Sequence, residues 1–159
     1  MESSQRAWTH LQVVLGIFPR VDAMLAVVLG VDTAMSGVFF AKWPEPEKAG
    51  PWLVILTVVF ALFSALSYLA IYRAAFPNLD SVGRSTVFFG DVANMTQAEY
   101  ENALLDVSDR ELARQIAHQA WRNSSILTVK FKYLRRAFGW LIASVAPWVL
   151  GLLTMSIAN

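Results

Sequence analysis

The sequence predicts an all-α membrane protein with three transmembrane helices and a small helical segment between the second and the third. Hydrophobic residues make up 56% of the chain and charged residues only 16%, whereas soluble domains carry about 25% charged residues. Three apolar runs reach the roughly 20 residues that a helix needs to cross a bilayer. Aromatic residues stand at the ends of these runs, as expected for side chains at headgroup level: Trp43, Trp52, Tyr68, Tyr72 and Trp140. A buried helical core in a soluble protein is the alternative.

Composition narrows the classes of function. A formal net charge of +1 over 159 residues argues against a nucleic-acid binder held by bulk charge. The absence of cysteine excludes disulfides and thiolate metal sites. No HExxH, GxSxG or glycine-rich phosphate loop is present, so we expect no enzyme, no metal site and no cofactor. The start MESSQRAWTH contains no signal-peptide pattern.

The predicted elements follow one another along the chain. We expect an N-terminal cytoplasmic or interfacial helix at 1–20, transmembrane helices at 21–41, 51–72 and 137–158, an external turn at 42–50, and a cytoplasmic helical segment at 73–136. The N-terminal helix either lies in the membrane interface or packs on the cytoplasmic part. The turn KWPEPEKAGPW cannot continue a helix because of its prolines and glycine.

The distribution of basic residues predicts the orientation. The external turn carries Lys42 and Lys48, balanced by Glu45 and Glu47, while the other lysines and arginines all fall on the opposite side of the three-span arrangement. By the positive-inside rule, that opposite side is the cytoplasm. The N-terminus is therefore predicted to be cytoplasmic and the C-terminus external.

Two acids interrupt the first span. Asp22 stands at its cytoplasmic mouth, and Asp32 lies ten residues further, about 15 Å along a helix. A carboxylate at that depth costs at least about 2.5–3.5 kcal/mol. Asp32 is either an oligomeric or pore-lining residue, or a protonated acid hydrogen-bonded between helices. Small residues suited to close helix contacts accompany it, and hydroxyl groups are available on the other spans: Gly30, Ala34 and Gly37; Thr57, Ser64, Ser67, Ser144 and Thr154.

Two capping boxes predict helices in the cytoplasmic segment. Thr96 with Glu99, and Ser108 with Glu111, have the spacing of this motif. We expect the second helix to run from Asp109 through the basic residues 130–136 directly into the third span.

A basic stripe is predicted on that second helix. Arg110, Arg114, His118 and Arg122 recur every four residues and therefore share one face. The stripe is either a solvated face or a phosphate clamp. In the second case the proposed ligand-binding residues are these: Arg84, Arg114, His118, Arg122, Phe88 and Tyr100.

The stretches RVDAMLAVVLGVDTAMSGV, GRSTVFFGDVA, QAEYENAL and SDRELARQIAHQAWRNSSILTVKFKYLRRAF resemble, in order and spacing, the Pycsar transmembrane effectors of bacterial antiphage defence. The resemblance implies an effector in the cell inner membrane that works beside a uridylate or cytidylate cyclase. It would sense cyclic UMP or cyclic CMP and impair the membrane, so that the infected cell stops growing or dies. One difference is that Ala23 and Met24 follow Asp22, where an Asp-Lys-Ala pattern is expected.

The resemblance and the residues together give one hypothesis. Nucleotide binding to the cytoplasmic segment would reorient the helix that continues into the third span, and the spans would assemble as a homo-oligomer through Asp32, Gly30, Ala34 and Gly37. The rival from another class is a constitutive small membrane scaffold or accessory subunit without a nucleotide ligand. An ordinary ion channel would require a selectivity element, and none is found in the sequence.

Overall fold

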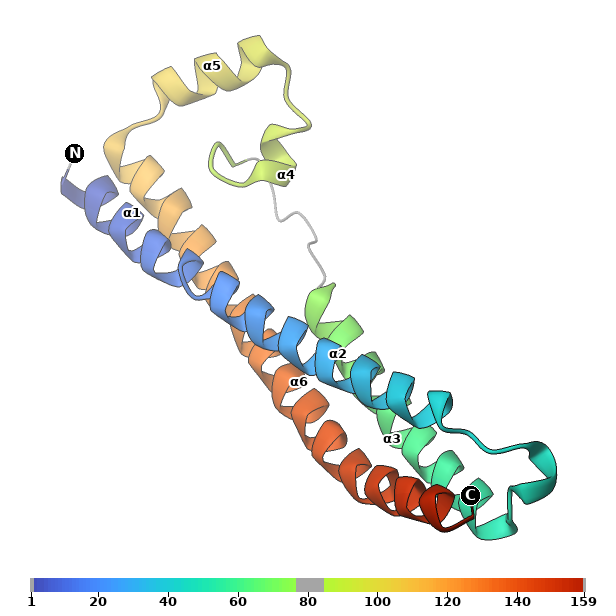
Figure 1. Cartoon of the computed structure of the whole chain (residues 1–159). Helices are drawn as coiled ribbons and strands as arrows, with labels where there is room; N and C mark the ends of the chain where they lie inside the picture. Colours follow the sequence, from blue (N-terminus) through green and yellow to red (C-terminus); the bar gives the residue numbers. More distant parts are fainter. Residues whose placement is uncertain (1, 77–84, 159) are drawn as a thin grey trace. The chain divides into compact units, whose positions relative to one another are not determined.

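The computed structural model describes residues 2–76 and 85–158, and these residues are helical apart from their turns (Figure 1). The elements are α1 (Glu2–Leu15), α2 (Phe18–Ala41), the short 3-10 helix η1 (Pro46–Lys48), α3 (Pro51–Ala75), α4 (Phe89–Val92), α5 (Gln97–Asp106) and α6 (Asp109–Ala158). Three stretches are long and apolar enough to cross a membrane: Glu2–Ala41, Pro51–Ala75 and Asp109–Ile157. The predicted fold class is confirmed.

The chain divides into two compact units. The first unit comprises residues 1–20 and 77–129, and the second comprises residues 21–76 and 130–159. Helix α6 contributes to both units, since their boundary at residues 129 and 130 falls inside it. The predicted limits of the six segments, and their sides of the membrane, stay predictions.

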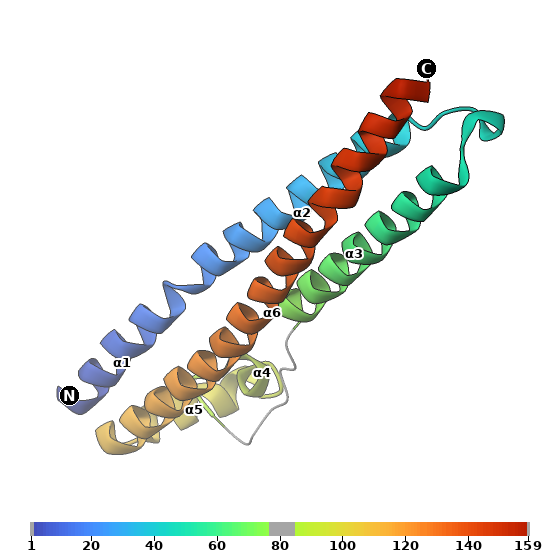
Figure 2. The same cartoon turned by 90° about the horizontal axis from the view of Figure 1, so that it is seen from below.

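The second unit is a bundle of α2, α3 and the later part of α6, which lie side by side in both views (Figures 1 and 2). Ring contacts join the helices: Phe39 of α2 lies 4.9 Å from Phe60 of α3, and Phe63 of α3 stacks on Trp140 of α6 at 5.8 Å between centroids. The outer faces are apolar as well, with large exposed side chains that include Val27, Val58, Leu62 and Ile142. A bundle that is apolar on both faces is typical of helices surrounded by lipid.

The turn between α2 and α3 follows from its sequence. Gly50 is the N-cap of α3 and has an extended conformation, and Pro51 occupies the first helical position. Proline suits this position because its missing N–H would have no partner there and its φ already matches the helix. Helices α2 and α3 are therefore separate helices joined by a short turn.

In the first unit, α1 packs on the early part of α6. Leu11 of α1 forms a buried cluster with Ile116 and Ala120 of α6, and Ala7, Val87 and Leu112 pack against it. Ser3 donates a hydrogen bond of 2.8 Å to the Asp109 carboxylate, and Ser4 donates another. Helix α1 therefore packs on α6 within the first unit; its placement at the membrane interface or in the cytoplasm stays a prediction.

The start of α5 and the length of α6 are as predicted. Thr96 and Glu99 form a complete capping box, in which each side chain bonds the other residue's backbone N–H. The Glu111 N–H donates to the Ser108 hydroxyl at 3.3 Å. Helix α6 then runs for 50 residues, with Pro147 inside it. The prediction that one helix extends from Asp109 into the third span is confirmed.

Candidate functional site

The basic stripe lies on the first-unit part of α6 and is mostly exposed. Arg110, Arg114 and His118 are exposed, whereas Arg122 is half-buried. Arg114 forms an ion pair with Glu111 at 3.2 Å, and their side chains are 73% and 46% exposed. A pair this exposed contributes about 0–1 kcal/mol at most, so the Arg114 guanidinium can exchange Glu111 for another anion at little cost.

Arg122 is held against an aromatic ring. Its guanidinium carbon lies 4.4 Å from the centroid of the Phe88 ring, and Phe88 is only 5% exposed. This cation–π contact uses the flat face of the guanidinium. Because the N–H donors of arginine lie in the plane of the group, they point away from that face. Arg122 is therefore positioned by Phe88 in a way that leaves hydrogen-bond donors along its edge.

A hydroxyl and a glycine fix Phe88 in place. The Ser85 hydroxyl accepts hydrogen bonds from the N–H groups of Val87 and Phe88, at 3.1 and 3.2 Å, which sets the turn that leads into α4. A Cβ at Gly90 would lie 2.7 Å from Cε1 of Phe88. Glycine at position 90 therefore gives the Phe88 ring the room it occupies.

Thr86 ties the same turn to α6. Its N–H and its hydroxyl both donate to Oε1 of Gln115, at 3.0 and 2.9 Å. These two bonds fix the orientation of the Gln115 amide, because the oxygen must face Thr86. The amide nitrogen, with its two donors, then faces the other way. Residues 85–88 thus contact α6 at Gln115 and at Arg122.

Among the cavities lined by described residues of the first unit, two share Thr86 in their lining. The larger, about 720 Å³, has both polar and apolar walls; its polar lining residues include Asp91, Asn94, Glu99, Asn102 and Gln115. The smaller, about 440 Å³, has aromatic and apolar walls; its lining includes Trp8, Tyr100, Leu104, Leu112 and Ile116. The volumes suit a small organic ligand, and the two linings offer amide groups and aromatic faces respectively.

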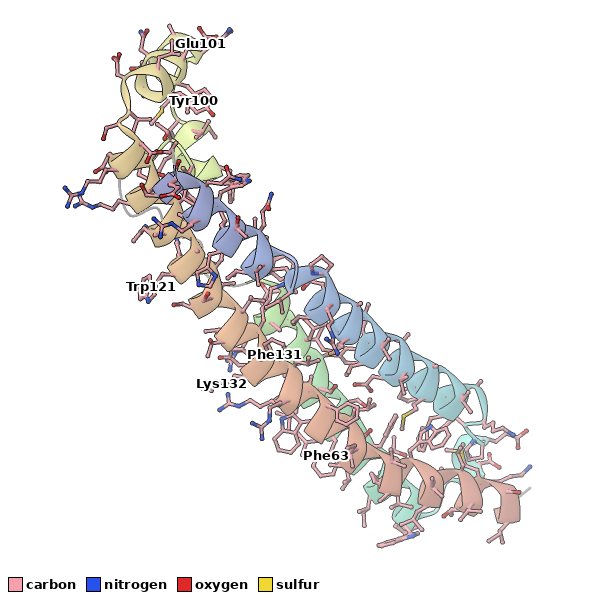
Figure 3. The ribbon with its side chains drawn as sticks, turned by 90° about the vertical axis from the view of Figure 1, so that its left-hand side faces the viewer. Phe63, Tyr100, Glu101, Trp121, Phe131 and Lys132 are labelled. Atoms are coloured by element: carbon pink, nitrogen blue, oxygen red, sulfur yellow. The ribbon has the colours of Figure 1, made fainter. Side chains whose placement is uncertain are left out.

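The structure brings only some of the predicted ligand-binding residues together. Phe88 and Arg122 are in contact, and Tyr100 lines the smaller cavity. Phe88, Arg114, His118 and Arg122 are not among the described residues that line either cavity. His118 neighbours Trp121, which is 68% exposed and points away from α6 (Figure 3). Arg84 falls outside the described residues.

The predicted assembly residues of the second unit lie on two faces of α2. Asp32 is 0% exposed, and neither carboxylate oxygen has a hydrogen-bond partner in the described part of the chain. Gly30, Ala34 and Gly37 are exposed, and a Cβ at either glycine would meet nothing within 4 Å. Asp32 therefore faces the bundle interior, while the small residues present an open outer face.

The other acid of α2 has a partner from α6. Asp22 forms an ion pair with Lys130, whose side chain is only 8% exposed, while that of Asp22 is 52% exposed. The two residues are far apart in the sequence, so no local pattern indicates the pair. It supplies Asp22 with the positive charge that the expected Asp-Lys-Ala pattern would have placed next to it.

Comparison with known proteins identifies the family. The model described as the Pycsar effector protein domain, PycTM, matches residues 6–156. The chain belongs to the Pycsar effector family. A curated relative, the Pycsar effector protein GmPycTM from Gulbenkiania mobilis, is 24% identical over 137 residues, which cover 76% of this chain and 70% of the relative. No solved structure matches the chain.

The PycTM match confirms the resemblance found in the sequence. The matched residues cover all but the ends of the three apolar stretches, and the whole segment between the second and third. The chain is therefore a Pycsar transmembrane effector, in a family that acts in antiphage cyclic-nucleotide signalling. It is a membrane protein with three candidate spans.

Sequence reasoning missed several residues of this PycTM chain that the structure places in its cavities. Thr86 and Gln115 anchor the turn before α4, and Trp8 and Asn94 line the cavities. They come from two helices, α1 and α6, and from the turns before and after α4, so no spacing within one element links them. A composition signal is also absent, since uncharged polar residues of this kind occur throughout the intervening segment.

Proposed function

We propose that the chain is an antiphage effector that senses a cyclic pyrimidine nucleotide, cyclic UMP or cyclic CMP, made by a partner uridylate or cytidylate cyclase. In response it impairs the inner membrane and causes growth arrest or death of the infected cell. The single observation that carries this proposal is the family match over residues 6–156. The three apolar helices are in accord with action in the membrane.

The first unit is the proposed sensor, within the predicted cytoplasmic segment 73–136 and together with the N-terminal helix. A cyclic mononucleotide carries one negative charge and a flat base. Its phosphate requires one or two arginine donors, and its base requires an aromatic face or amide groups. Arg122 is the proposed phosphate ligand, because the Phe88 ring covers only the flat face of its guanidinium and not the N–H groups along the edge. Arg114 and His118 are the further proposed donors on the same face of α6.

The base is proposed to enter a cavity that Thr86 lines, next to the turn that carries Phe88. Tyr100 lines the smaller cavity, and Thr86, two residues before Phe88, lines both cavities. A ligand in either cavity therefore lies against the turn that positions Phe88, and through Phe88 it acts on Arg122. Arg84 stays part of the proposal from the sequence.

The second unit is the proposed effector part. The N-terminus is proposed to be cytoplasmic, with α2, α3 and the later part of α6 crossing the inner membrane. The exposed face of Gly30, Ala34 and Gly37 permits close approach of a neighbouring helix, which supports assembly into a homo-oligomer. Asp32, on the inner face of the same helix, is proposed to become part of the disrupted membrane path when the bundle rearranges.

Calorimetry of the detergent-solubilised full chain tests nucleotide sensing. Cyclic UMP, cyclic CMP, cyclic AMP and cyclic GMP are titrated into the wild type, Arg122→Ala and Tyr100→Ala. Arg6→Ala is the matched control, because Arg6 is an exposed arginine of the first unit whose side chain bonds the Glu2 carbonyl. We expect one pyrimidine nucleotide to bind, and Arg122→Ala to bind it about tenfold to a hundredfold more weakly, since one charge-assisted bond is lost.

Vesicle leakage tests the membrane part. The protein is reconstituted into anionic phospholipid vesicles, and release of a trapped dye is followed after addition of the nucleotide that binds. Release that depends on the nucleotide supports the proposal. Absence of binding to all four nucleotides by folded protein, together with absence of leakage, contradicts it and favours the constitutive scaffold or accessory subunit.

A further inference from the structure

Buried polar side chains of the second unit come from all three of its helices. Asp32 of α2, Ser64 and Ser67 of α3, and Ser144 of α6 are 0%, 5%, 0% and 0% exposed, respectively. We call these four residues the polar layer. Apolar side chains make up most of the remaining buried surface of this unit, so four inward polar groups require an explanation.

Contacts between α2 and α6 place Asp32 level with Ser144. The indole N–H of Trp148 donates a 2.9 Å hydrogen bond to the carbonyl of Met35. The two helices run in the same direction, because the Asp22–Lys130 pair precedes this contact on both. Asp32 and Ser144 each lie about one helical turn before their member of the Met35–Trp148 pair, and both side chains are buried.

Contacts of α3 place Ser67 about two helical turns before Ser144 along α6, and Ser64 between these two levels. The hydroxyls of Thr33 and Tyr68 are 3.2 Å apart, which sets Asp32 beside the Ser67 turn of α3. The Ser67 hydroxyl in turn bonds the carbonyl of Ala137 in α6. Ser64 lies one turn from Ser67 on the same inward face of α3.

The polar layer is rich in acceptors and poor in donors. Ser67 donates its hydroxyl hydrogen to Ala137 at 3.3 Å, and Ser144 donates its own to Leu141 at 2.7 Å. A hydroxyl has a single hydrogen, so these two groups can offer only lone pairs to the interior. Both oxygens of Asp32 and the Ser64 oxygen have no hydrogen-bond partner among the described residues.

Proline adds to the same imbalance. Pro147 has no N–H, so it cannot donate to the carbonyl of Ala143, the residue next to Ser144. The buried lysine of this unit does not supply the missing donor, because Lys130 pairs with Asp22. Asp22 lies ten residues, or about 15 Å, along α2 from Asp32. The polar layer thus combines one carboxylate with several oxygen acceptors, and no basic side chain of the described residues bonds it.

We propose that the polar layer binds one monovalent metal cation, Na⁺ or K⁺, through the Asp32 carboxylate and the Ser64 and Ser144 hydroxyl oxygens. Hard cations prefer oxygen ligands, and a single positive charge neutralises the single carboxylate. A divalent ion would leave an excess charge in the membrane interior, which is costly. The bound cation would join the three helices and stabilise the packed bundle. This proposal does not depend on the nucleotide.

Thermal unfolding of the full chain in detergent tests the site. The unfolding temperature is measured in sodium, potassium and choline chloride at equal ionic strength. We expect sodium or potassium to raise it by about 3–6 °C over choline, as for a ligand about tenfold above its dissociation constant. Asp32→Asn should abolish this rise and Ser64→Ala should reduce it. Asp22→Asn, which removes an acid from the same helix outside the polar layer, should retain the rise.

Equal unfolding temperatures in all three salts would overturn the proposal and leave a proton as the group that neutralises Asp32. A salt-specific rise that persists in Asp32→Asn would overturn it too. If Asp32→Asn does not fold, equilibrium dialysis with radioactive sodium decides. The proposal requires one bound ion per wild-type chain, which excess sodium or potassium displaces and choline does not. Ser64→Ala should bind sodium more weakly. If no sodium is bound and potassium does not change the unfolding temperature, the proposal is overturned.

Discussion

Alanine in place of Gly151 would push a methyl group into the ring of Phe39. A Cβ at Gly151 lies 2.5 Å from Cε2 and 2.9 Å from Cζ of that ring, which is closer than carbon atoms approach one another. The ring has little freedom to move away, since Phe39 is 0% exposed and its centroid lies 4.9 Å from that of Phe60 and 6.2 Å from that of Trp43. Helices α2 and α6 would therefore have to separate locally.

The size of the effect follows from two opposing contributions. Overpacking of this kind costs about 1–3 kcal/mol, while alanine gains about 0.8–1.0 kcal/mol over glycine in a helix interior. Gly139, in the same helix, has nothing within 4 Å of an added Cβ, so Gly139→Ala should show the gain alone. The free energies of unfolding of the two variants should then differ by about 1–3 kcal/mol, and each kcal/mol corresponds to about 2–4 °C for a chain of this size.

Circular dichroism during heating in detergent provides the assay. Gly151→Ala should unfold at a lower temperature than Gly139→Ala, and the gap should narrow when Phe39→Leu is added to Gly151→Ala, because leucine leaves room for the methyl group. Phe39→Leu alone measures the loss of stability caused by the smaller side chain. The double-mutant cycle then gives the interaction energy between positions 39 and 151. If the two alanine variants unfold at the same temperature, or if Phe39→Leu brings no coupling, the close contact does not exist.

Three further predictions concern single contacts. Thr96→Ala removes the capping hydroxyl of α5 and should lower the stability of that helix by about 1 kcal/mol, seen as faster amide hydrogen exchange in α5 only. Lys130→Met keeps the aliphatic part of the side chain and removes the charge opposite Asp22. We expect the free energy of unfolding to fall by about 1–2 kcal/mol, and adding Asp22→Asn should not lower it further. Gly90→Ala would place a Cβ 2.7 Å from the Phe88 ring and should displace that ring, so nucleotide affinity should fall while the unfolding temperature of the second unit stays the same; unchanged affinity would contradict the role of this ring.

The fold could be predicted from the sequence because its signals are local. An apolar run of sufficient length forms a spanning helix on its own, and the capping box of α5 lies within the four residues from Thr96 to Glu99. The length of α6 was also predictable, since residues 109–138 contain neither glycine nor proline. None of these features depends on contacts between distant parts of the chain.

The site could be predicted only in part because its contacts are between distant residues. The helical period placed Arg114, His118 and Arg122 on one face, yet it could not indicate that only Arg122 meets an aromatic ring. Likewise, the position of Asp32 within an apolar run was evident from the sequence, but the sequence did not indicate which side of α2 faces the bundle. An apolar helix with little amphipathic contrast offers no sequence signal for its inner face; contacts such as Trp148 to Met35 decide it.

The distribution of helix-weakening residues in α6 favours the polar layer as the place where this helix adjusts. The part of α6 in the first unit has no glycine or proline, so bending it would break successive i→i−4 hydrogen bonds. Gly139, Pro147 and Gly151 all lie in the second unit, on either side of Ser144. If a ligand displaced Arg122, the glycine- and proline-free part of α6 would therefore move without bending. The helix would bend instead in the stretch that carries Ser144. Because that stretch also contributes to the polar layer, a cation bound at Asp32 would oppose the movement that nucleotide binding is proposed to promote.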